Sequence, residues 1–268
     1  MSAISVLIVL AAYAYGVSRV WRRAGRGQGI GARQAIGFGV GSLALLVAFS
    51  PWMHDLSERR LFAHMLQHEL LMVVAAPCLA WGAPVIALLW ALPRSARRRV
   101  GSWLPEIDSP QWRLLTAPPT VFALYAAALW LWHVPAAYAF AIEHNWVHLL
   151  EHACFLFAAC LFWWGIAYGT HGRARYGAAV VYVFATAIHG GLLGALLTIS
   201  PRVWYQPYMQ QGTPGLSALE DQQLAGLLMW IPASMGFVAG GLMLFAAWLI
   251  HSDRATRFPS VARLESPR

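Results

Sequence analysis

HNWVHLLEHACFLFAACLFWW, residues 144–164, combines the two features that decide how this chain folds. Its second half is apolar and uncharged and continues to residue 168, so it supplies the ~20 residues that a bilayer-crossing helix needs. Its first half places His144, His148 and His152 four residues apart, which puts the three imidazoles on one face of a helix. We therefore expect a transmembrane helix over 144–168 with a histidine ladder at one end.

The rest of the chain also has the composition of a membrane protein. Of its 268 residues, 59% are hydrophobic and 11% are charged, against about 25% charged residues in a soluble domain. We predict an all-α, polytopic transmembrane helical bundle with seven spans, over residues 3–21, 34–50, 60–92, 118–142, 144–168, 177–199 and 221–250.

Proline and glycine interrupt two of these spans. Pro77, Gly82 and Pro84 should kink the third span. Pro135 should either bend the fourth span or end it, which would leave a short external helix around 135–143.

Arginine placement predicts the orientation of the bundle. The chain has no lysine, and all its arginines except Arg59, Arg60 and Arg202 lie in or beside the segments 22–33, 93–117, 169–176 and 251–268. By the positive-inside rule these segments are cytoplasmic, so the N-terminus is outside and the C-terminus is cytoplasmic. The net charge of +8 then reflects topology and lipid headgroups, and we expect no nucleic-acid partner.

We expect one membrane domain over 1–250 and a disordered, polar cytoplasmic tail over 251–268. No basic residue precedes Arg19, so the first span is expected to stay in the membrane and not to be a cleaved signal peptide.

This topology gathers most histidines towards the outer side. His64 and His68 lie in the first two turns of the third span, His133 ends the fourth, and His189 lies about ten residues into the sixth. Together with the ladder on the fifth span, these imidazoles would converge about two turns below the outer surface. Buried imidazoles are costly in lipid, and donors aimed at one point from rigid helices are what a transition metal needs.

The donor types narrow the choice of metal. Imidazole suits copper, zinc, iron and nickel, whereas the thioether of Met72, which continues the His64–His68 stripe, favours cuprous copper. Glu151 and Glu69 lie in apolar helices, where a carboxyl group should be protonated or paired. Each could orient an imidazole or ligate a metal directly. The cysteines form no pair typical of zinc or iron–sulfur sites and are read as small buried hydrophobes. The candidate metal ligands are His64, His68, His148, His152, His189, Met72, His133, Glu151, Glu220 and Asp221.

Two readings stay open for Glu220 and Asp221, which begin the seventh span. Ser217 and Glu220 fit a helix capping box, and acidic side chains suit a helix N-terminus. The same two carboxylates could also capture a metal ion.

Three blocks of the sequence resemble the CtaG family of membrane cytochrome c oxidase assembly factors. They are HMLQHELLM, LWHVPAAYAFAIEHNWVHLLEH with the following FLFAACLFWW, and LSALEDQQLAGLLMWIP, in this order within about residues 54–250. By position, the family's motifs correspond to His64, His68, His133, His148, His152 and His189, with Glu220 and Asp221 in the last block.

The resemblance implies a non-enzymatic role in building a heme–copper oxidase in the bacterial plasma membrane. The implied cargo is copper, as Cu(I), bound by a ligand layer that faces the periplasmic or extracellular side. The implied partners are an oxidase subunit, other copper chaperones and the lipid bilayer. A cysteine-based relay is not available to this chain, because it has no external cysteine pair.

Other functions remain open at this point. Histidines on facing helices also ligate heme b, and a metal-free scaffold for an immature oxidase subunit would use the histidines for hydrogen bonds alone. A proton- or metal-coupled transporter would need acidic and histidine residues that continue to the cytoplasmic side, and few do. The sequence leaves a homodimer open as well.

Overall fold

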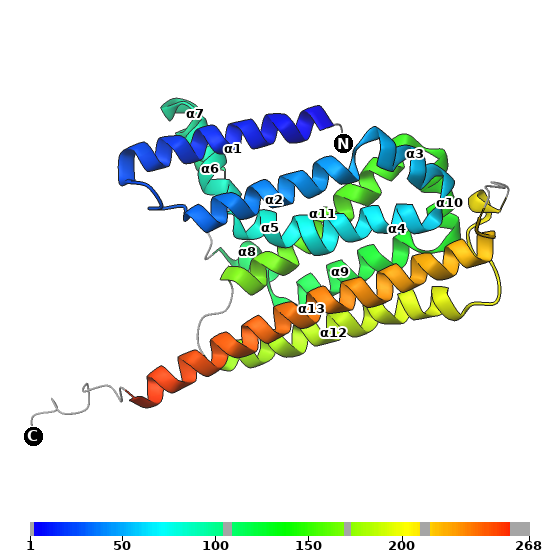
Figure 1. Cartoon of the computed structure of the whole chain (residues 1–268). Coiled ribbons are helices and arrows are strands. Elements are labelled where there is room, and N and C mark those ends of the chain that lie inside the picture. Colours follow the sequence, from blue (N-terminus) through cyan, green and yellow to red (C-terminus); the bar gives the residue numbers. More distant parts are fainter. Residues whose placement is uncertain (1–2, 104–108, 169–172, 210–214, 258–268) are drawn as a thin grey trace, which may run out of the picture.

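The computed structural model describes residues 3–103, 109–168, 173–209 and 215–257, and within these ranges the chain is helical without strands (Figure 1). This confirms the predicted all-α class. The elements are α1 (Ala3–Ala24), α2 (Ala32–Ala48), α3 (Pro51–Arg59), α4 (Leu61–Glu69), the π-helical η1 (Leu70–Ala75), α5 (Ala76–Trp81), α6 (Pro84–Ala91), α7 (Arg94–Gly101), α8 (Pro110–Leu115), α9 (Pro118–Trp132), α10 (Pro135–Glu143), α11 (Asn145–Tyr168), α12 (Arg173–Ile199), the 3-10 helical η2 (Gln206–Tyr208) and α13 (Ala218–Arg257).

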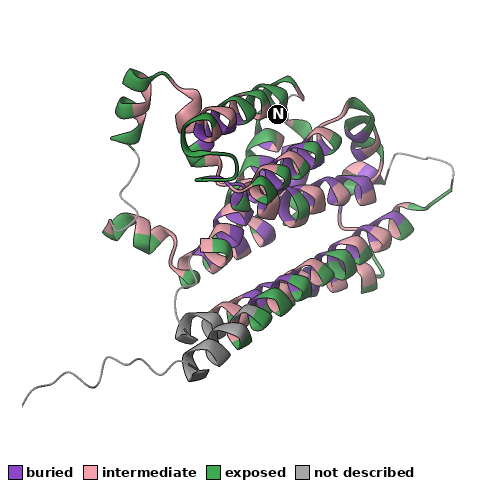
Figure 2. Ribbon diagram, turned by 60° about the vertical axis from the view of Figure 1, so that its left-hand side comes forward, coloured by how far each residue is buried: buried purple, intermediate pink, exposed green. Residues whose placement is uncertain are grey.

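The helices fit a multi-pass membrane protein with five to seven spans. Among the described residues, five helical stretches are long and apolar enough to cross a bilayer: Ala3–Ala24, Leu61–Trp81, Asn145–Tyr168, Ala179–Ile199 and Ala218–Ala246. Two bent pairs, α2 with α3 at 52° and α9 with α10 at 75°, bring the number to seven if each pair is one span. Figure 2 shows buried residues on the inner faces of these helices and exposed ones outside. Many exposed side chains are large and apolar, among them Leu43, Phe184 and Leu242, as expected of helices that face lipid.

Two predicted boundaries differ from the structure, and one of the two alternatives predicted at Pro135 is confirmed. The third span ends at Trp81 and not at 92, because Ala83 adopts a left-handed conformation (φ 49°) between Gly82 and Pro84. The chain then turns into the separate helix α6, which packs on α1. Pro135 ends the fourth helix, and α10 follows as a separate helix over the predicted range. The last helix runs to Arg257, past the predicted boundary at 250, while residues 258–268 lie outside the description.

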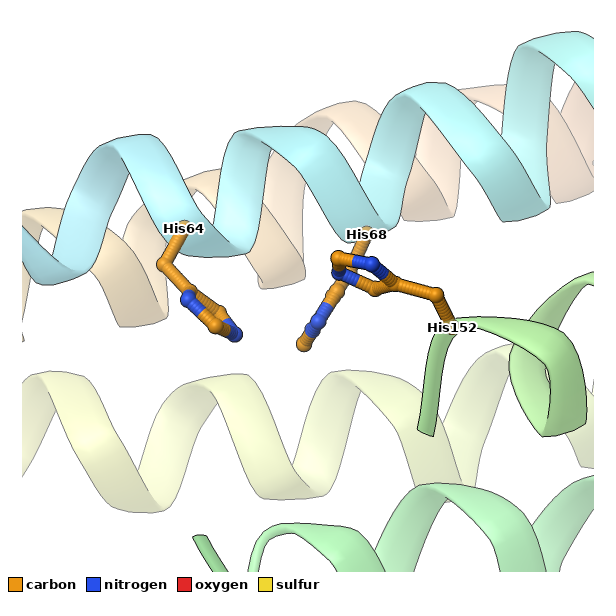
Figure 3. Close-up of side chains that lie close together, drawn as sticks. All are labelled: His64, His68 and His152. Atoms are coloured by element: carbon orange, nitrogen blue, oxygen red, sulfur yellow. The ribbon is translucent and has the colours of Figure 1, made fainter. Parts of the chain in front are cut away.

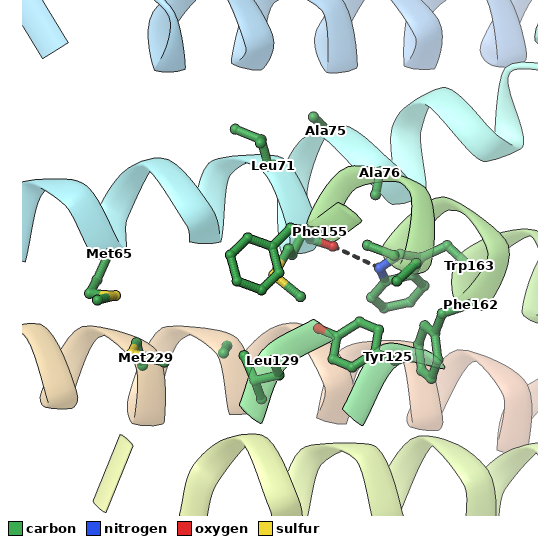
Figure 4. Packing of buried hydrophobic residues seen from close by; sticks show 14 of the residues in the cluster. Met65, Leu71, Ala75, Ala76, Tyr125, Leu129, Phe155, Phe162, Trp163 and Met229 are labelled. Carbon is green, nitrogen blue, oxygen red and sulfur yellow. Dashed lines mark hydrogen bonds between the residues drawn. The ribbon is translucent and has the colours of Figure 1, made fainter. Parts of the chain in front are cut away.

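The rod formed by α4, η1 and α5 crosses the middle of the bundle, where it contacts α2, α11 and α13. Its inner side packs into the main apolar core with residues such as Phe155, Phe162 and Met229 (Figure 4). At the π-helical turn, the indole Nε1 of Trp163 donates to the carbonyl of Met72 over 2.9 Å. Regular α-helical spacing therefore ends at Glu69, and Met72 is buried in this core.

The long helices α12 and α13 lie side by side along most of their length (Figure 1). Gly226 of α13 makes their close approach possible. A Cβ added there would lie 2.5 Å from Thr198 Oγ1 and 2.6 Å from the Gly194 carbonyl oxygen. Small residues at helix interfaces let backbones approach in this way.

Replacing Gly226 with alanine should therefore push the two helices apart. We expect Gly226→Ala to cost about 1–3 kcal/mol of stability, as overpacking of a tight contact does. Thermal unfolding in one fixed detergent measures the loss. Gly165→Ala on α11 is the matched control, because a Cβ there meets nothing within 4 Å. Equal melting temperatures for the two variants would contradict the proposed packing role.

Candidate metal centre

Two helices present the central side chains of the site. α4 carries His64 and His68 one turn apart, and α11 carries His148, Glu151 and His152 on one face. Figure 3 shows His64 and His68 pointing from α4 towards His152 of α11. These five residues are called the histidine group below.

The imidazole rings of the histidine group contact one another directly. Ring centroids lie 4.5 Å apart for His64 and His68, 5.2 Å for His68 and His152, and 4.4 Å for His148 and His152. His64 also stacks on His148, with centroids 5.1 Å apart and planes 19° apart. The two ladders predicted from the sequence therefore converge.

Two overlapping sets of donors within this group are close enough to share an ion. The inner set is His64, His68 and His152, and the outer set is His64, His148 and Glu151. In each set, one ligand atom per residue lies within 4.8 Å of the others. All three inner residues are buried, whereas His148 of the outer set is partly exposed. No cysteine belongs to either set in the described part of the chain.

Every residue of these sets has at least one buried nitrogen or oxygen atom without a hydrogen-bond partner. Both ring nitrogens of His64 and His68, Nε2 of His148 and His152, and both carboxylate oxygens of Glu151 are buried and unpaired. Glu151 Oε1 approaches His68 Nε2 only to 3.8 Å, which is too long for a hydrogen bond. Since buried polar atoms are nearly always paired, so many unpaired donors at one point fit a shared metal ion.

His133 lies next to the inner set. Its ring centroid is 6.0 Å from that of His68, and its Nδ1 donates to the Leu129 carbonyl oxygen over 2.7 Å. Because this bond places the proton on Nδ1, the buried and unpaired Nε2 is the nitrogen left for a metal.

Three tyrosines cover one side of the group, and sequence reasoning missed them. Tyr138 packs on His64, Tyr205 donates to the His133 carbonyl oxygen, and Tyr208 donates to the Ser57 carbonyl oxygen. The hydroxyls of Tyr138 and Tyr208 are 3.0 Å apart. Burial raises the pKa of Tyr205 and of Tyr208, so both hydroxyls stay protonated and can donate. Two tyrosines in the loop motif YQPY, between two predicted spans, were the available signal.

His189 does not join the histidine group. α12 packs against α9 and α13, and the His189 ring contacts Phe122 and Tyr125 of α9, with centroids 5.2 and 5.9 Å away. The expectation that His189 reaches the same ligand layer is therefore not met. Glu69 is also outside both sets, with its Oε2 buried and unpaired.

The carboxylates of Glu220 and Asp221 are used in helix capping. Glu220 accepts hydrogen bonds from the Ser217 backbone N–H and hydroxyl, both at 2.8 Å, and its own N–H donates to Ser217 Oγ. This confirms the predicted capping box of α13. Asp221 instead caps α4: its two oxygens accept the N–H groups of Leu61 and Phe62 at 2.9 and 3.0 Å. Neither residue belongs to the inner or outer set.

The next residue, Gln222, makes hydrogen bonds to the loop segment that leads to Tyr205 and Tyr208. Its side-chain oxygen accepts the Trp204 N–H at 2.6 Å, and its amide donates to the Arg202 carbonyl oxygen at 3.0 Å. Three consecutive residues of α13 therefore make hydrogen bonds to three places: Glu220 to the residue that caps α13, Asp221 to the start of α4, and Gln222 to the loop that leads to Tyr205. The block LEDQQ positions the histidine group without contributing a donor to either set.

Comparison with known proteins points to one family. A family model described as cytochrome c oxidase caa3 assembly factor matches residues 11–250, a range that includes the whole histidine group. Comparisons with curated proteins and with solved structures gave no match.

Proposed function

Because the chain belongs to the cytochrome c oxidase caa3 assembly factor family, we propose that it binds copper through the histidine group and assists metallation of a heme–copper oxidase. The observation that carries the proposal is the inner set: its three buried imidazoles each bring one ring nitrogen within 4.8 Å of the others, and each has an unpaired ring nitrogen. The family assignment agrees with the resemblance of the three sequence blocks and implies an oxidase partner in a membrane.

The inner set fits copper as cargo. His64, His68 and His152 each offer a neutral ring nitrogen, a ligand that suits copper. The Nε2 of His133 is available as a fourth nitrogen, and the proposal does not need Met72. On the predicted topology these ligands lie near the periplasmic or extracellular side, from which we propose that copper arrives as Cu(I).

The close packing of the rings disfavours heme as the ligand. Two axial histidines must leave a flat gap between them for the macrocycle. Here His64 stacks directly on His148, and Tyr138, Phe155 and Phe49 pack on the remaining faces of the group. A single metal ion needs much less space than a porphyrin.

Metal analysis of the purified full-length protein tests the proposal. After loading with Cu(I) under reducing conditions and desalting, we expect about one copper ion per chain, because the two donor sets share His64. An absorption spectrum of the same sample should lack a Soret band. Protein that retains no copper but still binds the oxidase would favour a metal-free scaffold, and a Soret band would favour heme.

A further inference from the structure

The two donor sets differ in how far they are from solvent. The inner residues His64, His68 and His152 are 1%, 2% and 5% exposed, beneath Tyr138 and Phe155. In the outer set, His148 is partly exposed, although Glu151 beside it is fully buried. An ion in the inner set therefore has no direct way to solvent, whereas an ion in the outer set would lie next to a partly exposed ligand.

His64 belongs to both sets and lies between them. Its ring centroid lies 4.5 Å from that of His68, in an edge-on arrangement, and 5.1 Å from that of His148, with the two rings stacked. Both of its nitrogens are unpaired, so hydrogen bonds do not fix its ring. The outer and inner sets are also in contact through His148 and His152, whose ring centroids lie 4.4 Å apart. An ion could pass from one set to the other while His64 stays bound, with one ligand exchanged at a time.

The donors also differ in chemistry. The inner set consists of imidazole nitrogens alone, whereas the outer set replaces one of them with a carboxylate oxygen. Carboxylate suits hard cations, and imidazole suits copper and other first-row transition metals better. The outer set is therefore the weaker of the two for Cu(I).

We propose that the outer set is an exchange position, through which a first-row transition metal ion, here Cu(I), enters and leaves the inner set, with His148 and Glu151 as the exchange ligands. This inference rests on the proposed function, since it describes how the same site loads and releases its metal. It assigns storage to His68 and His152 and transfer to His148 and Glu151.

The test separates how much copper is held from how fast it leaves. Full-length protein in detergent is loaded with Cu(I) under reducing conditions and desalted, and bound copper is counted by mass spectrometry. Excess bicinchoninate, a chromogenic Cu(I) chelator, is then added, and its absorbance reports the rate of release. We expect His148→Ala to retain wild-type copper but to release it at least ~10-fold more slowly, because the ligand that would take the ion from the inner set is missing; single contacts at metal sites typically change affinity or activity by about 10–100-fold.

Two further variants complete the design. Glu151→Gln keeps the shape of the side chain and should also slow release with copper retained. His144→Ala is the matched control on the same ladder, because its Nδ1 bonds the Phe140 carbonyl oxygen and it belongs to neither donor set. It should release copper at the wild-type rate.

Two results would overturn the exchange position while leaving the proposed function intact. One is wild-type release rates in both His148→Ala and Glu151→Gln. The other is loss of bound copper in His148→Ala, which would mean one undivided site. Wild-type protein that binds no copper would overturn both proposals, and circular dichroism of each variant separates these results from failure to fold.

Discussion

A chain that carries both His68→Ala and His152→Ala is expected to lose its copper and to leave the oxidase of the same cells short of copper. The double change removes two of the three inner nitrogens, so His64 alone remains from that set. Loss of a single supporting contact at a metal site typically costs 10–100-fold in affinity, and loss of two ligands should cost more. Copper is counted in the purified double variant, and also in the oxidase isolated from cells that produce this variant.

The control for this experiment is His189→Ala. His189 is also a histidine within a candidate span, and both its nitrogens are unpaired, yet it lies against α9 and outside both donor sets. We expect copper retention to stay at the wild-type level in this variant. A fully metallated oxidase in cells that carry the double variant would rule out the copper role. Copper loss in His189→Ala equal to that of the double variant would mean that the site extends to α12.

Each histidine ladder could be predicted from the sequence because it depends only on helical periodicity, whereas the meeting of the two ladders depends on which helices pack together. His64 and His68, like His148 and His152, are four residues apart and must share a helix face in any regular helix. Their apolar neighbours require that face to be buried in the bundle. The capping box at Ser217 and Glu220 was equally readable, because it is a local pattern of two side chains and their own backbone.

The features that sequence reasoning missed all depend on contacts between distant segments. The regular turns of the third span end at Glu69, where the π-helical segment that follows includes a carbonyl bonded to Trp163 of α11. The direction of His189 is set by the packing of α12 against α9 and α13. Residues 84–91 look like the end of a long span, yet they form a separate helix that packs on α1. No periodicity within one segment encodes which neighbour it packs against.

Asp221 is the clearest case of a residue whose role depends on a distant partner. From sequence it reads as a metal ligand or as a cap for its own helix, but it caps α4, 160 residues away along the chain. The start of α4 lies three residues before His64, so this carboxylate fixes the position of the histidine group from α13. Metal ligation and remote capping then predict different results for the same substitution.

Asp221→Ala should destabilise the protein even when no metal is bound. The carboxylate is 2% exposed and accepts two backbone N–H groups that would otherwise be buried without partners. From the usual values for lost caps and for hydrogen bonds to a charged group, we expect a loss of roughly 2–4 kcal/mol. The thermal unfolding midpoint of the metal-free protein, in one fixed detergent, measures it.

Comparison of three variants separates capping from ligation. Asp221→Asn keeps one acceptor oxygen and should recover part of the lost stability, and Glu220→Ala should lose less than Asp221→Ala, because Glu220 caps only the exposed start of α13. Copper retention should fall in Asp221→Ala together with the unfolding midpoint, since the start of α4 moves and carries His64 with it. If Asp221→Ala instead lost copper while the metal-free protein unfolded at the wild-type temperature, Asp221 would be a ligand and the capping account would be wrong. Because the two hydrogen bonds link α13 to the helix that carries His64 and His68, we expect stability and copper retention to change together.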